Sequence, residues 1–255
     1  MKRKKIVIAN WKMNEDVDSS TALAKKIKTG LAKKTDYEVV ICPDFVSLVP
    51  LYQLLSGTNL KLGAQDVAEE EKGAFTGEVS ILTLKPYAKY VIVGHSERRN
   101  LIGEGDRETA RKAEVAVRHK VYPIICAGET LHEKEDGLSR IVVLSQLEAA
   151  CKHLTAGEIA KTIVAYEPIW STGSGKVCEA EEVVKVAEDI RKLIKTLYGQ
   201  KASEEIRIVY GGSIDDSNVS SFSEIEDLDG LLVGGASLHP SEFISIVKKF
   251  NGENK

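Results

Sequence analysis

Residues 206–212 read IRIVYGG and residues 229–235 read DGLLVGG, and each is an apolar run that closes on two glycines. Six earlier runs have the same character, mostly β-branched and without alternation of apolar and polar residues. Continuous apolar character is typical of strands buried on both faces, as in a parallel sheet. The six are KIVIAN (5–10), EVVICP (38–43), LKLGAQD (60–66), KYVIVGH (89–95), VYPIICAGE (121–129) and TIVAYEP (162–168).

Most segments between these runs have helical periodicity. Residues 181–200 place Val183, Val186, Ile190, Leu193 and Leu197 on one helical face, and Gly199 supplies a left-handed stop. Residues 20–34 and 241–250 likewise pair an apolar stripe with lysines. Eight alternating units predict an α/β protein, a closed (β/α)8 barrel forming a single domain over residues 1–255. A doubly wound open sheet is the rival, but it would not by itself explain eight strands.

The composition excludes several classes of function. Lysine and arginine number 35 against 38 aspartates and glutamates, a net charge of −3. The basic residues are scattered, so we expect no nucleic-acid partner. The four cysteines form no CxxC pair and have no histidine at metal-ligand spacing, which predicts a reduced, cytoplasmic location and no structural zinc. No run reaches the length of a membrane span, and we expect MKRKK to lead into the first strand rather than to open a signal peptide.

Nearly every run closes on polar or glycine residues. In a barrel the carboxyl ends of all strands meet at one rim, where active sites are built. These terminal residues are therefore candidates for chemistry. They are Asn10, Pro43, Gln65, Gly94, His95, Gly128, Glu129, Glu167, Gly211, Gly212, Gly234 and Gly235.

Two of these residues suit acid–base chemistry. Glu167 precedes Pro168, which disfavours helix and leaves the carboxylate at the end of its strand. At the apolar mouth of a barrel it would be partly desolvated, as suits a general base, although a salt-bridged loop glutamate is the alternative. His95 precedes Ser96, which could begin a helix whose amides would keep the imidazole neutral.

A cation and three glycine clusters indicate an anionic ligand. Lys12 stands two residues beyond Asn10 and could reach an anion at the rim, or could form an imine as in an aldolase. STGSG, GGS and GGAS follow the last three strands and would let backbone amides approach a phosphate. Residues 170–177 depart from a P-loop and residues 103–108 from a dinucleotide fingerprint, so neither ATP nor NAD is inferred.

Seven motifs in order resemble the triosephosphate isomerase family over essentially the whole chain. They are NWKMN (10–14), GAFTGE (73–78), VGHSERR (93–99), CAGETL (126–131), AYEPIW (165–170), YGGS (210–213) and LVGGASL (232–238). The resemblance implies a TIM barrel that interconverts dihydroxyacetone phosphate and D-glyceraldehyde 3-phosphate, in glycolysis and gluconeogenesis, with no metal and no organic cofactor.

The resemblance also implies roles for single residues. Glu167 would move a proton between two carbons, while neutral His95 donates to the enediolate oxygens. Lys12 would supply positive charge to the phosphate and the enediolate, with Asn10 beside it as a hydrogen-bond donor. The phosphate would be held by Gly173, Ser213, Gly234 and Gly235, and the site supported by Ser96 and by Glu97, which could pair with Lys12.

The family further implies a closing lid and a homodimer. The tip residue Thr172 stands where many members have isoleucine, which would leave Glu167 less completely desolvated. Thr76, near the tip of its loop, would enter a pocket of the partner close to Asn10 and Lys12. The alternatives are a class I aldolase and a non-catalytic phosphate-binding barrel. The lid comprises Pro168, Ile169, Trp170, Ser171, Thr172, Gly173, Ser174, Gly175 and Lys176.

Overall fold

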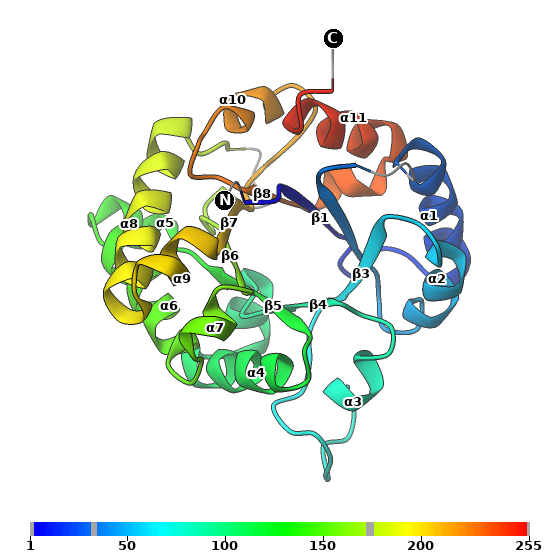
Figure 1. Cartoon of the computed structure of the whole chain (residues 1–255), viewed down its shortest axis with the longest axis horizontal. Coiled ribbons are helices and arrows are strands. Elements are labelled where there is room, and N and C mark those ends of the chain that lie inside the picture. The colour runs from blue at the N-terminus through cyan, green and yellow to red at the C-terminus, as the bar shows by residue number, and fades with distance from the viewer. Residues whose placement is uncertain (1–2, 32–34, 172–175, 254–255) are drawn as a thin grey trace.

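The strands form one closed barrel in the computed structural model, which describes residues 3–31, 35–171 and 176–253 (Figure 1). Each strand pairs in parallel with the next along the chain, and β1 pairs with β8 to complete the ring. The predicted (β/α)8 barrel of a single domain is therefore confirmed. The strands are β1 Ile6–Asn10, β2 Glu38–Cys42, β3 Leu60–Ala64, β4 Tyr90–Val93, β5 Tyr122–Ala127, β6 Ile163–Tyr166, β7 Arg207–Tyr210 and β8 Gly230–Val233.

Helices surround this ring and cover the outer faces of the strands (Figure 1). None of the described helices is long and apolar enough to cross a bilayer. The longer ones are α1 Val17–Leu31, α2 Leu48–Leu55, α4 Asp106–Arg118, α6 Ser139–Cys151, α8 Ala180–Tyr198 and α11 Pro240–Phe250. The short ones are α3 Ile81–Leu84, η1 Arg98–Ile102, α5 Leu131–Glu135, α7 Ala156–Ile159, α9 Gln200–Glu205, α10 Val219–Ser223 and η2 Gly235–Leu238.

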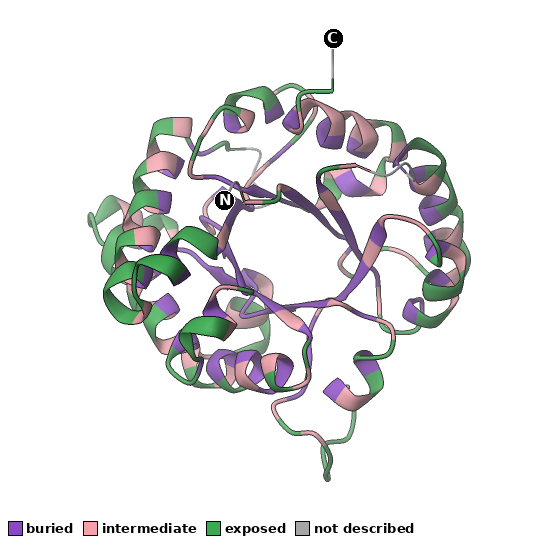
Figure 2. Cartoon of the chain, viewed as in Figure 1, coloured by how far each residue is buried: buried purple, intermediate pink, exposed green. Residues whose placement is uncertain are grey.

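The strands are buried on both faces, as their continuous apolar character predicts (Figure 2). Within β1, Ile6 and Ile8 belong to the cluster that fills the barrel, while Val7 and Ala9 belong to the cluster between strands and helices. The period of two along a strand produces this division. The barrel interior is thus a packed core and not a channel.

The predicted stripe of α8 needs one correction. Val183 and Ile190 are buried as expected, but Leu197 is exposed. The buried face instead ends at Ile194, and Leu197 lies in the last turn of the helix, beyond its last fully buried residue. Gly199 ends the helix as predicted, but its φ of +88° and ψ of 170° lie outside the expected left-handed helical region.

Closure of the barrel depends on a residue without a side chain. Gly230 in β8 lies opposite Ile6 in β1. A Cβ built on Gly230 would stand 1.9 Å from the carbonyl oxygen of Ile6. That atom is backbone and is held by the sheet, so no side-chain rotation can relieve the contact.

We expect Gly230→Ala to lower the free energy of unfolding by about 3 kcal/mol, because β1 and β8 must separate to admit the methyl group. Urea denaturation would measure the change. Gly157→Ala in α7 is the matched control, since nothing lies within 4 Å of its added Cβ, and its stability should be equal or slightly higher. Equal midpoints for the two variants would contradict this account of closure.

Candidate active site

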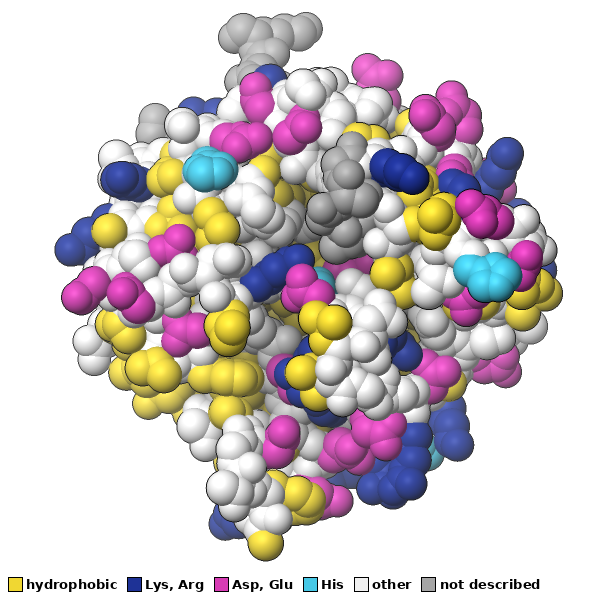
Figure 3. All heavy atoms as spheres, turned by 180° about the vertical axis from the view of Figure 1, so that it is seen from behind, with side chains coloured by type: hydrophobic (Ala, Val, Ile, Leu, Met, Phe, Trp, Pro, Cys, Tyr) yellow, Lys and Arg dark blue, Asp and Glu magenta, His cyan; other side chains and the backbone are white. Residues whose placement is uncertain are grey.

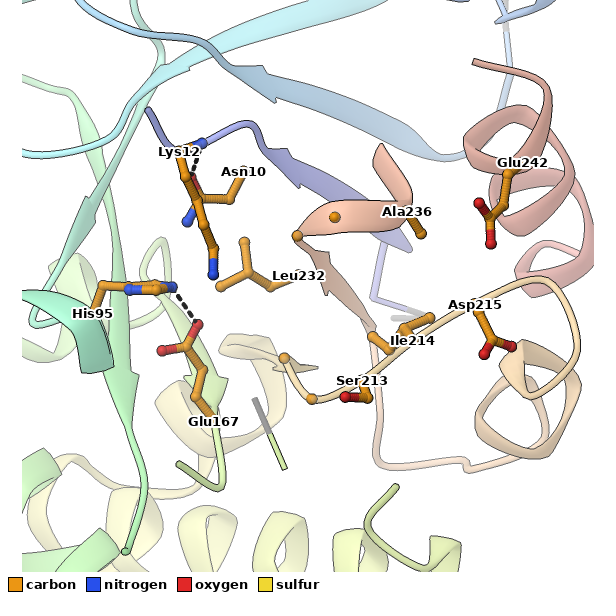
Figure 4. A pocket seen from close by; sticks show the side chains of 14 residues that line it. Asn10, Lys12, His95, Glu167, Ser213, Ile214, Asp215, Leu232, Ala236 and Glu242 are labelled. Carbon is orange, nitrogen blue, oxygen red and sulfur yellow. Dashed lines mark hydrogen bonds and ion pairs between the residues drawn. The ribbon is translucent and has the colours of Figure 1, made fainter. Parts of the chain in front are cut away.

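A cavity of about 360 Å³ opens at the carboxyl ends of the strands (Figure 4). Lys12, His95 and Glu167 extend into it from three different strands and point toward one another. Asp215 and Glu242 lie at its far side. The other lining residues are Asn10, Gly211, Gly212, Ser213, Ile214, Leu232, Gly234, Gly235 and Ala236.

Glu167 is held by an extension of the sheet beyond β6. Its N–H donates to the carbonyl of Ala127 at 2.8 Å, which continues the pairing of β6 with β5. Two glycines make room for it. A Cβ on Gly128 would stand 1.8 Å from the carbonyl oxygen of Glu167, and one on Gly211 would stand 2.9 Å from its Cγ. The residue is only 2 % exposed, so the carboxylate has few water contacts.

His95 follows β4 after Gly94, whose φ of +68° turns the chain at the rim. Its Nδ1 accepts the N–H of Glu97 at 3.3 Å, and its Nε2 lies 3.2 Å from Oε1 of Glu167. An acceptor at Nδ1 leaves the proton of the neutral imidazole on Nε2, which therefore donates toward the cavity. This tautomer is the one required of a hydrogen-bond donor to substrate.

The pKa of His95 is raised, whereas the sequence-based expectation is that helix amides disfavour the charged ring. Burial disfavours the imidazolium, but the charge and hydrogen bond of Glu167, aided by Glu97, outweigh it and raise the pKa of His95. The nearby Lys12 opposes this rise. The helix amides expected to favour a neutral ring therefore do not lower the pKa of His95 while Glu167 touches it. Neutral His95 stays a prediction for a complex in which substrate separates the two side chains.

Lys12 is fixed by its backbone and by its ammonium group. It has φ +54°, a region that few non-glycine residues adopt. Its N–H donates to Oδ1 of Asn10 at 3.1 Å, and Gln65 Nε2 donates to its carbonyl at 2.7 Å. Its Nζ lies 2.6 Å from Oε1 of Glu97, which confirms the expected pair. The backbone conformation and these contacts aim the ammonium group at the cavity.

The glycines after β8 border the same ammonium group. A Cβ on Gly234 would stand 3.5 Å from Cε and 3.8 Å from Nζ of Lys12. Gly235 has nothing within 4 Å of its missing Cβ. Both line the cavity together with Ser213. An anion placed here would meet backbone N–H groups on one side and a cation on the other.

The start of the expected lid is anchored to the end of β5. The Ile169 N–H donates to the Glu129 carbonyl at 2.9 Å, and Trp170 Nε1 donates to Glu129 Oε1 at 2.8 Å. Burial raises the pKa of Glu129, against the hydrogen bonds from Trp170 and Tyr166 that lower it. Lys134 Nζ lies 3.6 Å from the centre of the Trp170 ring.

Ser171 connects this segment to the residues after β7. Its Oγ donates to the Lys176 carbonyl at 2.7 Å, and its own carbonyl accepts from Ser213 Oγ at 2.6 Å. Pro168 to Ser171 and Lys176 thus have defined places beside the cavity. Thr172, Gly173, Ser174 and Gly175 lie outside the described residues.

Sequence reasoning missed three residues that position the site. Gly128, Gly211 and Gln65 were noted as strand ends but given no role. Gly128 and Gly211 make room for Glu167 by having no side chain. A missing side chain gives the sequence no pattern that would reveal this role. Gln65 offered a signal, a polar residue on the rim, but its contact with Lys12 joins two strands that are distant in the sequence.

Metal-binding side chains do not gather at this site. Across residues 3–31, 35–171 and 176–253, no group of three histidine, cysteine, aspartate or glutamate side chains could hold an ion.

Comparison with known proteins gives a consistent result. The family model for triosephosphate isomerase matches residues 5–250. The triosephosphate isomerase of Clostridium tetani is 44% identical over 246 residues, covering 96% of each chain. Those of Thermoanaerobacter sp. (strain X514) and Clostridium beijerinckii are 43% and 39% identical, and each match covers 96% of this chain and 99% of the relative.

We expect the pKa of His95, followed by NMR of its ring, to lie above the ordinary histidine value and to fall in Glu167→Gln. The amide removes the negative charge that favours the imidazolium and leaves burial to oppose it. Glu97→Gln is the control and should lower the pKa less, because Glu97 lies 3.7 Å from Nδ1 and is half exposed. A rise in Glu167→Gln would contradict the assigned cause.

Proposed function

The chain belongs to the triosephosphate isomerase family, and from this premise we propose that the rim cavity is its active site. The chain interconverts dihydroxyacetone phosphate and D-glyceraldehyde 3-phosphate. One observation supports the location above all others. A buried carboxylate, an imidazole with Nε2–H available and an ammonium group meet in one cavity beside glycines suited to a phosphate.

In this proposal Glu167 is the base that removes a proton from one substrate carbon and returns it to the other. Low exposure leaves its carboxylate with few water contacts, so that the carboxylate can meet the substrate carbon directly. Substrate would enter between Glu167 and His95, replacing their 3.2 Å contact. His95 would then donate its Nε2–H to the oxygen that becomes negative in the enediolate.

Stabilising the enediolate is the largest demand on this site, since a carbon acid ionises with difficulty. Lys12 supplies the positive charge for both the enediolate and the phosphate. Asn10 uses its carbonyl oxygen to accept the Lys12 N–H and keeps its amide nitrogen as a donor for substrate. Glu97 positions two catalytic residues. Its carboxylate accepts from the ammonium group of Lys12, and its backbone N–H donates to Nδ1 of His95. The Ser96 N–H lies 3.4 Å from Glu167 Oε2 and supports the base.

We propose that the phosphate is held by Lys12 together with Ser213, Gly234 and Gly235. All four line the cavity, and the spacing of Gly234 from Lys12 supports a shared anion. Gly173, expected as a further amide, lies outside the described residues. A lid over residues 168–176 is supported at its start by the contacts of Trp170 with Glu129.

The aldolase alternative has less support from the same geometry. An imine-forming amine must be free to attack the substrate carbonyl, whereas Nζ of Lys12 is paired with Oε1 of Glu97 at 2.6 Å. Borohydride in the presence of substrate would trap an imine covalently and should trap none here. A non-catalytic barrel would bind phosphate analogues yet leave substrate protons unexchanged.

The first test is conversion of glyceraldehyde 3-phosphate in a coupled assay without added metal or nucleotide. We expect turnover in the native protein and a loss of about 10²-fold in Glu167→Asp, because one methylene withdraws the carboxylate from the substrate carbon. Glu204→Asp, on the surface of α9, is the control and should keep full activity. Full activity in Glu167→Asp would remove Glu167 as the positioned base.

We further propose that the protein is a homodimer. Met13, Leu101 and Ile102 are 95%, 78% and 65% exposed, which is unusual for large apolar side chains in one region. Met13, Leu101 and Ile102, with Phe45, border a cavity of about 260 Å³ that also contains Lys12 and His95. Figure 3 shows hydrophobic side chains gathered on this face of the molecule.

The occupant proposed for this cavity is the loop of a second copy, with Thr76 near its tip. Residues 65–80 project beyond the ring between β3 and α3 (Figure 1), and Phe75 beside Thr76 is half exposed. Because the cavity adjoins Lys12, assembly and activity would be coupled.

We expect Thr76→Arg to give monomers with at least about tenfold lower turnover, because a much longer, positively charged side chain would have to enter a cavity that Lys12 and Arg98 already line. Sedimentation measured alongside activity would test both effects. Thr196→Arg, exposed on α8, is the control and should stay dimeric. Monomers with full activity would refute the coupling.

A cytoplasmic location is part of the same proposal. All four cysteines are free and buried, as expected in a reducing compartment.

A further inference from the structure

A second cavity, of about 410 Å³, lies at the other end of the strands from the active site. It adjoins the starts of β3, β4 and β5, whereas the catalytic groups follow the strand ends. We call it the lysine pocket. It is lined by Lys61, Lys85, Lys89 and Lys120 together with Tyr52 and Tyr87, among other residues.

The lysine pocket carries uncompensated positive charge. Among the described residues, no aspartate or glutamate lines it. Lys61, Lys85 and Lys120 make no ion pair within the part of the chain that the structure describes. Lys89 lies 3.1 Å from Glu38, but Glu38 also pairs with Arg207 at 2.7 Å, so one carboxylate serves two cations. In a chain with net charge −3, four lysines gathered around one cavity form a local exception.

The backbone at Lys120 is a second, independent observation. Lys120 has φ +62° in the turn from α4 to β5. Its N–H donates to Val117 and the next N–H, of Val121, donates to Ala116. Such helix ends usually carry glycine, because a side chain in this conformation costs about 1 kcal/mol. Strain of this kind is often found at functional positions, which suggests a role for the charge of Lys120 beside the pocket.

The pocket also has an aromatic wall. The rings of Tyr52 and Tyr87 meet edge to face, with centroids 5.5 Å apart at 78°. Leu55, Leu60 and Leu62, which are almost fully buried, also line the pocket. Several ammonium groups beside aromatic rings fit a chain of phosphates, with or without an attached ring.

We propose that the lysine pocket binds a polyphosphate chain, at a site separate from the substrate phosphate site. The recognition chemistry is several adjacent negative charges met by Lys61, Lys85, Lys89 and Lys120. The ligand could come from inorganic polyphosphate or from a nucleoside triphosphate. In the second case the base would lie against Tyr52 and Tyr87.

Calorimetric titration of the whole protein with inorganic tripolyphosphate and, separately, with ATP would test the proposal, both at low salt and without magnesium. We expect saturable binding at one site per chain outside the active site. Lys85→Gln/Lys120→Gln should weaken it about tenfold. Tighter binding of ATP would add the tyrosines to the recognition, and equal binding would assign it to the lysines alone.

Two controls distinguish binding in the lysine pocket from general attraction of anions to surface lysines and from binding in the active site. Lys26→Gln/Lys201→Gln also removes two positive charges, but from exposed helix positions outside the pocket, and it should leave binding unchanged. Lys12→Met removes the cation of the active site and should also leave it unchanged. Circular dichroism would verify that each variant is folded.

The proposal fails if neither anion binds saturably, if the surface control weakens binding as much as the pocket variant does, or if binding is lost in Lys12→Met. Isomerase turnover of Lys85→Gln/Lys120→Gln should equal that of the native protein. Failure of the polyphosphate site is therefore distinguishable from failure of the proposed active site.

Discussion

The pairing of β1 with β8 is the contact on which the rest of the molecule depends. It joins residues more than two hundred positions apart, and it forms because Gly230 lets β8 approach the carbonyl of Ile6. Closure brings the ends of all eight strands to one rim. Lys12, after the first strand, then lies beside Gly234, after the last, and the chemistry of the site is a consequence of that proximity.

Electrostatic balance inside the cavity is set by two glutamates with different surroundings. Glu167 is buried and touches His95, while Glu97 is half exposed and holds Lys12. The imidazole lies between them and responds to both, so its protonation follows the positions of the carboxylates. A substrate that intervenes between Glu167 and His95 would therefore remove the contact that raises the pKa of His95.

The sequence allowed the strands to be predicted closely, because burial on both faces leaves continuous β-branched runs such as IVIA and LLV. It allowed the site residues to be nominated from their place at strand ends. The sequence was less informative about burial and pKa values that depend on contacts between distant residues. Leu197 has the right spacing but lies beyond the reach of the barrel, and the pKa of His95 depends on Glu167, which is seventy-two positions away. The need for glycine at positions 128 and 211 is evident only when the structure places Glu167 beside them.

The arrangement of the phosphate site has a consequence for synthesis of the protein on the ribosome. Its cation, Lys12, emerges more than two hundred residues before Gly234 and Gly235. A growing chain that lacks β8 has neither a closed barrel nor both halves of the anion site. Substrate therefore cannot stabilise a partly made chain through this site, and ligand-assisted folding can begin only after translation has passed the last strand.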